Sequence, residues 1–520
     1  MRAVRAAAGV AVLILAVTFV LALGGERDRM VDGPVAGARG GVDIAVPSGY
    51  QVELVARGLS FPTQVTFDER GELYIVESGG HGEGEARLVK LAPDRSLRPV
   101  ATGFTAPLIG VVVKEGRIWA SHRGRITLIE PNGARRDLVT GLPSLGDHSN
   151  NYPVLGPDGW LYFGQGTATN SAVVGLDNLR WLKRHPGVHD RPATDLTLVG
   201  HNFTTLNPLV PGEQTVASTG AFSPFAISSV PGQTVRGSVK PNGAVYRVRP
   251  DGTGLEVVAW GFRNPYGLTF DRRGFLWVYN QGYDDRGSRP VGNAPDELHP
   301  VQSGRWYGYP DYSAGELLAQ PKFKPAAGPV PQSLLRTHPA VPPKPWAVLP
   351  PHSAGGAFDF APAGFGYDDD FFIPLIGPLD PRTPAERALG AKIVRVSRNG
   401  KVSDFAVNRV PGPASLSGLT GFEHPSCVRF GPDGALYVTD FGVMRMGEKG
   451  LELVPNTGTL WRISRRSARP AMAPPGGVSA PGAPADEGFG PLGPVGIFAL
   501  GALFGGLLGA SLHATLRRRR

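Results

Sequence analysis

The sequence predicts an all-β fold, a six-bladed β-propeller, mainly because one short phrase recurs along the chain. Each copy has a hydrophobic residue, a turn with Gly and a run of strand-forming residues, which is the pattern of a β-hairpin. The turn glycines Gly71, Gly116 and Gly159 follow one another at intervals of 45 and 43 residues. Such a period is typical of propeller blades. The copies cover residues 67–76, 113–119, 156–163, 270–278 and 431–438.

A second hairpin phrase follows most copies of the first, so that each unit can form a four-stranded sheet. Its clear copies cover residues 124–133, 243–252, 390–400 and 458–464. Together the phrases place a propeller at residues 50–466, with an insert at about 176–236 in the third blade. A long ordered insert of this kind is typical of a lid or a partner surface. The predicted blades are 61–107, 108–148, 149–262, 263–350, 351–412 and 422–466.

A third pattern predicts how the ring closes. Several outer strands end in an apolar run and a Gly, but the first such run, at 55–59, has no blade before it. The last blade ends at Ser464 without an outer strand. We therefore expect residues 51–55 to pair with residues 459–463, which also protects the sheet edges. The alternative is a five-bladed or irregular all-β sandwich.

The composition agrees with a turn-rich β fold and excludes several classes of site. The 520 residues include 72 Gly and 50 Pro, and only 19% are charged. The single cysteine, Cys427, excludes an intrachain disulfide, a Cys-based zinc site and a covalently attached c-type haem.

Both ends of the chain have the pattern of membrane segments. The apolar run 6–23 follows two arginines and indicates a signal peptide or signal anchor, while 495–516 is long enough to span a bilayer and precedes four arginines. The positive-inside rule then places the propeller on the extracytoplasmic side of the cell membrane. The tail fits a retained anchor or a processed sorting signal. The predicted parts are a signal segment at 1–25, a linker at 26–49, a stalk at 467–494, a transmembrane helix at 495–516 and a basic tail at 517–520.

The net charge of +9 comes partly from these terminal arginines, and no basic stripe with interleaved aromatic residues is present. The sequence therefore predicts no nucleic-acid partner.

The residues that bear chemistry gather in and after the fourth blade. Residues 261–267 read Gly-Phe-Arg-Asn-Pro-Tyr-Gly, and the phrases at 279–285, 296–299 and 304–310 follow. A further pair, Asp147-His148, precedes the third blade's turn. In this order and spacing, the chain resembles the glucose/sorbosone dehydrogenase family over residues 50–465. These are propellers that use pyrroloquinoline quinone (PQQ).

The resemblance implies specific roles. His148 would be the general base that removes the hydroxyl proton of a sugar. Arg263, Asn264 and Gln281 would bind the cofactor, where a cation stabilises charge that develops on reduction. The backbone carbonyls of a Gly-Tyr step would help to hold calcium, and nearby acids would serve a second calcium site or its loop. These expected metal-site residues are Gly282, Tyr283, Asp284, Asp285, Asp296 and Glu297.

The same residues also have structural interpretations. His148 could cap a loop, and Arg263 with Asn264 could hydrogen-bond neighbouring blades. The chain also departs from glucose-active members of the family, which have a Lys after the fifth blade's inner strand and two arginines before the last one. Here residues 373–378 contain no Lys, and residues 421–426 read Gly-Phe-Glu-His-Pro-Ser.

Three functions follow from these observations. The first is a membrane-tethered quinoprotein that oxidises a sugar or a related alcohol or aldehyde. The second is a non-catalytic surface propeller that binds carbohydrate or a protein partner. The third is a calcium-dependent hydrolase of the lactonase type. The sequence favours the first.

Overall fold

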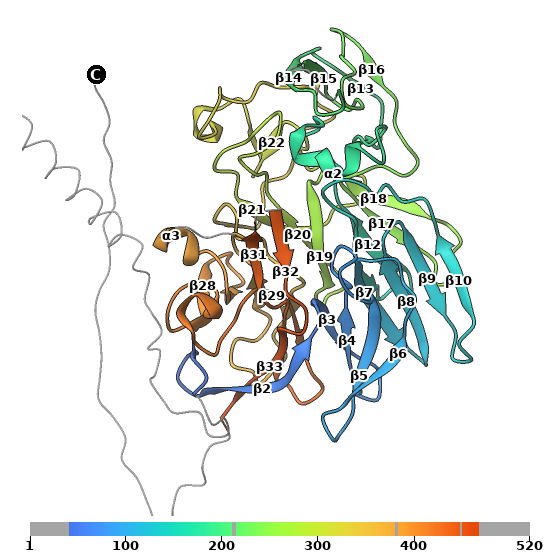
Figure 1. Ribbon diagram of the computed structural model, residues 1–520. Coiled ribbons are helices and arrows are strands. Elements are labelled where there is room, and N and C mark those ends of the chain that lie inside the picture. The colour runs from blue at the N-terminus through green and yellow to red at the C-terminus, as the bar shows by residue number, and fades with distance from the viewer. Residues whose placement is uncertain (1–40, 211–214, 380–382, 448–449, 467–520) are drawn as a thin grey trace, which may run out of the picture. The chain divides into compact units, whose positions relative to one another are not determined.

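Six antiparallel sheets follow one another along the chain and form the blades of a β-propeller (Figure 1). The computed structural model describes residues 41–210, 215–379, 383–447 and 450–466. The predicted six-bladed fold is confirmed, because each sheet contains the two hairpins of one predicted unit.

The first five blades are built from strands in chain order. Blade one consists of β3 (Pro62–Phe67), β4 (Leu73–Glu77), β5 (Arg87–Leu91) and β6 (Leu97–Ala101), and blade two of β7 (Leu108–Lys114), β8 (Arg117–His122), β9 (Arg125–Ile129) and β10 (Arg135–Val139). Blade three consists of β11 (Asn150–Leu155), β12 (Leu161–Gln165), β17 (Ala244–Val248) and β18 (Glu256–Trp260), and blade four of β19 (Asn264–Phe270), β20 (Leu276–Gln281), β21 (Asp296–Pro300) and β24 (Ala347–Leu349). Blade five consists of β25 (Asp359–Phe360), β26 (Phe371–Leu375), β27 (Lys392–Val396) and β28 (Val402–Asn408).

The turn between the first two strands of a blade explains the recurring phrase. Its glycine has a positive φ, between +72° and +82° in the five copies, a conformation that favours Gly over other residues. In the copies at 67–76 and 270–278, an Asp at the start of the turn accepts backbone N–H groups with its side chain, as Asp271 does from Arg273 and Phe275, both at 2.9 Å. The phrase therefore encodes a turn whose hydrogen bonds are formed within the phrase itself.

Blade six closes the ring as predicted. It combines β29 (Pro425–Phe430), β30 (Leu436–Asp440) and β33 (Gly458–Arg465) with β2 (Tyr50–Leu59) from the other end of the propeller. In this pairing Val52 lies opposite Ile463 and Leu54 opposite Trp461. The expected pairing of residues 51–55 with 459–463 is confirmed.

The segment before β2 differs from the prediction. Residues 26–49 were expected to form a linker, but β1 (Ile44–Ala45) pairs with β28 as a fifth strand of blade five. Val42, Ile44 and Val46 are all buried there. Their apolar side chains join the core between blades five and six, so residues 42–46 are part of the propeller.

The hydrophobic core lies between neighbouring blades. Val76 and Leu88 of blade one, for example, pack in the same cluster as Val111 and Ala120 of blade two. Each fully buried aliphatic side chain of this kind stabilises the fold by roughly 1.5–3 kcal/mol. Alternate residues of each strand face the adjacent blade, which explains the period-2 pattern of the sequence.

Two long connections extend beyond the blades. Blade three contains residues 166–243 between β12 and β17, a longer insert than the expected 176–236. Blade four contains residues 301–346 between β21 and β24. The two connections touch each other, since Leu198 and Leu335 form a β-bridge. The first contains η1 (Leu176–Asn178), α2 (Leu179–Leu182), β13 (Leu196–Thr197), β14 (Asn202–Leu206), β15 (Val216–Gly220) and β16 (Thr234–Val235), and the second β22 (Tyr312–Ser313), β23 (Glu316–Leu317) and η2 (Pro321–Phe323).

The remaining short elements are α3 (Pro384–Arg387), η3 (Ala414–Ser417) and the hairpin of β31 (Met444–Gly447) and β32 (Gly450–Leu453). No helix within the described ranges is long and apolar enough to cross a membrane. The predicted signal segment, stalk, transmembrane helix and basic tail lie outside the described residues.

Candidate active site

The centre of the propeller contains a cavity of about 850 Å³ that all six blades line. Its wall includes residues near the starts of the first strands of several blades, which converge on the channel. Such residues are Thr63, Ile109, Asn151, Asn264 and Ser426. A volume of this size falls within the usual range for small-molecule sites, about 300–1,000 Å³.

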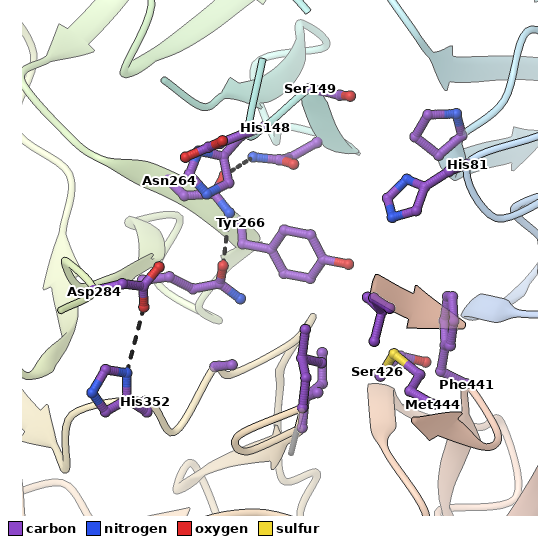
Figure 2. Close-up of a pocket in the computed structure, with 18 of the residues that line it drawn as sticks. His81, His148, Ser149, Asn264, Tyr266, Asp284, His352, Ser426, Phe441 and Met444 are labelled. Carbon is purple, nitrogen blue, oxygen red and sulfur yellow. Dashed lines mark hydrogen bonds and ion pairs between the residues drawn. The ribbon is translucent and has the colours of Figure 1, made fainter. Parts of the chain in front are cut away.

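His148, the predicted general base, lies on this wall in the loop before β11 (Figure 2). Its Nδ1 is 2.9 Å from the carbonyl oxygen of Thr167. A carbonyl can only accept a hydrogen bond, so Nδ1 carries the hydrogen, and Nε2 of the neutral ring keeps its lone pair. Nε2 has no hydrogen-bond partner among the described residues. The ring is therefore oriented as a base toward the cavity.

The electrostatic surroundings keep this ring neutral. Burial, together with the positive charges of Arg263 and Arg286, holds the pKa of His148 well below its ordinary value. Gly166 is essential to this packing, because a Cβ there would lie 2.4 Å from Cβ of His148 and 2.5 Å from Oδ1 of Asn264. The sequence thus allows His148 and Asn264 to approach each other closely.

A chain of side-chain amides crosses the cavity wall beside His148. Asn151 donates to Oδ1 of Asn264 at 2.9 Å, and Nδ2 of Asn264 donates to Oε1 of Gln281 at 2.7 Å. Gln281 in turn donates to the carbonyl of Gly355 at 2.9 Å. Since Asn151 and Gln281 each donate to a carbonyl, the orientation of all three amides is fixed. Blades three, four and five are joined in this way.

Arg263 lies directly before β19 and has only 4% of its side chain exposed. Its NH2 group donates to Oδ2 of Asp284 at 2.6 Å, and its Nε donates to the carbonyl of Asn170 at 3.3 Å. Burial opposes ionisation of Asp284, but Arg263, His352 and Arg286 together hold the pKa of its carboxyl well below the ordinary value. Figure 2 shows Asp284 and His352 on the same side of the cavity.

Arg286 extends this ion pair into a cluster that sequence reasoning missed. Its guanidinium contacts the carboxylates of Asp147, Asp177 and Asp284 at 2.9, 2.8 and 3.2 Å. These attractions outweigh burial and raise the pKa of Arg286 above its ordinary value. Burial and the neighbouring Asp147 raise the pKa of Asp177 to about 6. The one feature of the sequence that could have indicated this cluster is the position of Arg286 two residues after Asp284.

Of the expected metal-site residues, Gly282, Asp284, Asp285 and Asp296 line the cavity, and Gly282 and Asp296 contact each other there. Asp296 accepts hydrogen bonds from the backbone N–H of Gly282 at 2.7 Å and from the hydroxyl of Tyr279 at 2.9 Å. Burial raises the pKa of Asp296 to about 6. The carbonyl oxygens of Gly282 and Tyr283 accept no hydrogen bond from any described residue. Both oxygens therefore keep free lone pairs, and Gly282 itself lines the cavity.

The side chains of Tyr283, Glu297 and Asp285 make other contacts. The side chain of Tyr283 is buried and stacks on Tyr309. Glu297 does not line the cavity and is hydrogen-bonded to Asn280 and His299. Asp285 lines the cavity, but its carboxylate accepts the N–H of Ala326 at 2.7 Å. Among the described residues, no three His, Cys, Asp or Glu side chains are close enough together to hold a metal ion.

Successive residues of a strand point to opposite faces, which explains why Asp296 and Glu297 do not act together. The positions at which the chain departs from the glucose-active members also differ in their surroundings. Ile376 lines the cavity, whereas His424 is buried and its Nδ1 lies 2.8 Å from the carbonyl of Gly442.

A second group of cations was not expected from the sequence. The turn between β8 and β9 contributes Arg123 to the cavity wall, and the insert of blade three contributes Arg180 and Trp181. His81, from the loop after β4, also lines it, and Figure 2 shows His81 across the cavity from His148. The recurring phrases do not include the insert, so the repeat pattern could not predict that Arg180 and Trp181 line the cavity.

Comparison with known proteins agrees with the resemblance seen in the sequence. The model of the glucose/sorbosone dehydrogenase family matches residues 228–335. The resemblance is confirmed over this segment. It contains Arg263, Asn264 and Gln281, whereas His148 lies outside it. No curated protein matches the chain in a sequence search.

Solved structures share the fold. The holo form of the PQQ domain of pyranose dehydrogenase from Coprinopsis cinerea is 18% identical with a TM-score of 0.50, and the match covers 83% of this chain and 99% of that one. The calcium structure of a carbohydrate-active enzyme of family AA12 from Trichoderma reesei is 16% identical with a TM-score of 0.50, covering 85% of this chain and 100% of that one. At these identities the likeness concerns the fold alone.

Proposed function

We propose that the protein is a PQQ-dependent sugar dehydrogenase, which oxidises a sugar or a related alcohol or aldehyde in the central cavity. The observation that carries this proposal is the arrangement of His148 beside the Asn264–Gln281 amide pair and the Arg263–Asp284 ion pair. A base with a free lone pair, fixed polar groups and a cavity of small-molecule size together fit an oxidation of this type. The family match over residues 228–335 supports it.

The residues present fit a quinone cofactor. Around the cavity lie hydrogen-bonding groups with fixed orientation, and Arg263 supplies a buried cation. Arg263, Asn264 and Gln281 would hold PQQ, and the free carbonyls of Gly282 and Tyr283 would provide hard oxygen ligands for calcium. When bound, the quinone accepts the hydride that the substrate carbon loses.

His148 moves the proton of this reaction. Nε2 takes the proton from the substrate hydroxyl as the C–H bond breaks, and Nδ1 remains hydrogen-bonded to Thr167. The carbonyl of Thr167 keeps the ring in one tautomer and one orientation. Because the pKa of His148 is lowered, the ring is unprotonated and ready to act at neutral pH.

Arg263 and Asp284 act by position and charge. The buried guanidinium faces a carboxylate, so it is oriented before any ligand binds. Such preorganised positive charge stabilises negative charge that develops on a bound group in a site with little water. The Asn151–Asn264–Gln281 chain keeps the neighbouring amides from rotating.

The test is reconstitution of the full-length protein with PQQ and calcium, followed by dye reduction with a panel of sugars. His148→Gln should lower kcat by at least about 100-fold, the usual contribution of a general base. It should leave the affinity for PQQ within about twofold of the unaltered protein, because His148 supplies no cation to the cofactor. A protein that binds no PQQ at saturating calcium, or a variant with full turnover, would contradict the proposal.

We also propose that the propeller is tethered on the extracytoplasmic side of the cell membrane, which the arginine bias at both apolar ends supports. Protease added to intact cells should cut within residues 470–494 and release the propeller. If the chain stays intact until the cells are lysed, the proposed orientation is wrong.

A further inference from the structure

Two arginines line the cavity on the side of blade two and the insert. Arg123 belongs to the turn between β8 and β9, and Arg180 belongs to α2. Their guanidinium carbons lie 5.2 and 5.1 Å from the ring centroid of Trp181. An aromatic ring at this distance attracts a guanidinium and restricts its orientation, and leaves its N–H groups available to a ligand.

Neither guanidinium forms an ion pair within the part of the chain that the structure describes. No carboxylate of the described residues lies within 4.0 Å of Arg123 or Arg180. Nε of Arg123 is buried and has no hydrogen-bond partner among the described residues. Glu83 is the nearby acid, but its carboxylate accepts the backbone N–H of His81. Burial and the charge of Arg180 lower the pKa of Arg123, and together they outweigh the opposing attraction of Glu83.

Arg123 is half-buried beside the like charge of the exposed Arg180, and an anion that contacts both guanidinium groups would offset this repulsion. Arg263 and Arg286 have carboxylate partners from the chain itself, whereas Arg123 and Arg180 have none among the residues that the structure describes. The planar N–H fork of arginine fits the two oxygens of a carboxylate, a group that quinone cofactors and acidic sugars carry. A ligand of the cavity with a carboxylate is therefore the natural counter-ion.

We propose that Arg123, Arg180 and Trp181 form a carboxylate-binding subsite of the central cavity. The carboxylate belongs either to the quinone cofactor or to an acidic sugar substrate, and both sources offer the same group to the two arginines. The identity of these two ligands rests on the proposed function, whereas the subsite itself rests on the unpaired arginines.

The experiment measures binding of three probes to the full-length protein by titration calorimetry at fixed ionic strength. The probes are PQQ with calcium, glucuronate, and glucose as the neutral counterpart of glucuronate. The variants are Arg123→Gln and Arg180→Gln. Arg57→Gln is the matched control, because Arg57 is an exposed residue of β2 that does not line the cavity and loses the same charge.

If the cofactor provides the carboxylate, each variant should weaken PQQ binding about tenfold or more, the usual effect of one charged hydrogen bond. If the substrate provides it, the unaltered protein should prefer glucuronate to glucose by about tenfold or more, and each variant should lose that preference. Arg57→Gln should change neither quantity. Arg180 is exposed, so Arg180→Gln keeps the test valid even if Arg123→Gln fails to fold.

Two results overturn the subsite: affinities that change no more in either variant than in Arg57→Gln, or an unaltered protein that binds none of the probes. The proposed function fails separately. A glucuronate preference without PQQ binding would contradict the dehydrogenase and keep the subsite. PQQ-dependent turnover by the unaltered protein, together with probe affinities that neither arginine variant changes, would contradict the subsite and keep the dehydrogenase.

Discussion

The two sides of the central cavity hold their arginines in opposite ways. On the side of blade four, Arg263 and Arg286 contact the carboxylates of Asp284, Asp147 and Asp177. On the side of blade two and the insert, Arg123 and Arg180 stack on Trp181 and have no carboxylate partner among the described residues. The first pair is part of the folded scaffold that orients the site, while the second pair keeps its charge for a ligand.

This difference predicts that the free energy of unfolding depends far more on Arg263 and Arg286 than on Arg123 and Arg180. Arg263→Met should lower the free energy of unfolding by about 2 kcal/mol, because the half-buried carboxylate of Asp284 loses its shortest charged hydrogen bond. Arg123→Met should cost less than about 1 kcal/mol, since it breaks no ion pair. Urea denaturation of the two full-length variants measures this difference. Equal losses would mean that the two sides do not differ as described.

A second prediction concerns the close approach of His148 and Asn264. Gly166→Ala should lower kcat/KM by about 100-fold, because the added methyl group displaces the base and its neighbour by a large part of an ångström. Gly187→Ala is the matched control, since a Cβ at Gly187 meets nothing within 4 Å. Steady-state kinetics with an artificial dye measures the effect. Full activity in Gly166→Ala would show that the position of His148 is not critical.

The third and smallest effect is on the pH dependence. Because the pKa of His148 is lowered, the neutral ring persists below pH 6.5, and activity should fall only when the pH drops through the lowered value. Asp284 opposes this shift, so Asp284→Asn should move the acid limb of kcat/KM to still lower pH. An acid limb at or above pH 6.5, or a shift to higher pH in the variant, would contradict the assignment of His148 as the base.

The sequence predicted what depends on local and repeated patterns. The turn glycines, the blade count and the pairing of β2 with β33 all follow from a phrase that each blade repeats. The meeting of His148, Asn264 and Gln281 in one cavity followed from their places at strand ends that face the channel. The sequence did not predict that residues 42–46 belong to the propeller, because β1 has only two paired residues and so short a strand shows no alternating pattern.

Contacts between the long connections could not be predicted in the same way. Arg286 meets Asp177 across 109 residues and Asp147 across 139, and nothing in the local sequence fixes such a pairing. Arg180 and Trp181 lie in an insert that no other blade repeats. The cluster of Arg123, Arg180 and Trp181 therefore forms only when the insert packs against blade two.

The central claim is that this cavity binds a quinone beside His148. A crystal structure of the full-length protein with PQQ and calcium tests it most directly. We predict one quinone in the cavity, in contact with Arg263, Asn264 or Gln281, with a cation at the carbonyls of Gly282 and Tyr283. A quinone bound outside the cavity, or an empty cavity at saturating PQQ and calcium, would contradict the account.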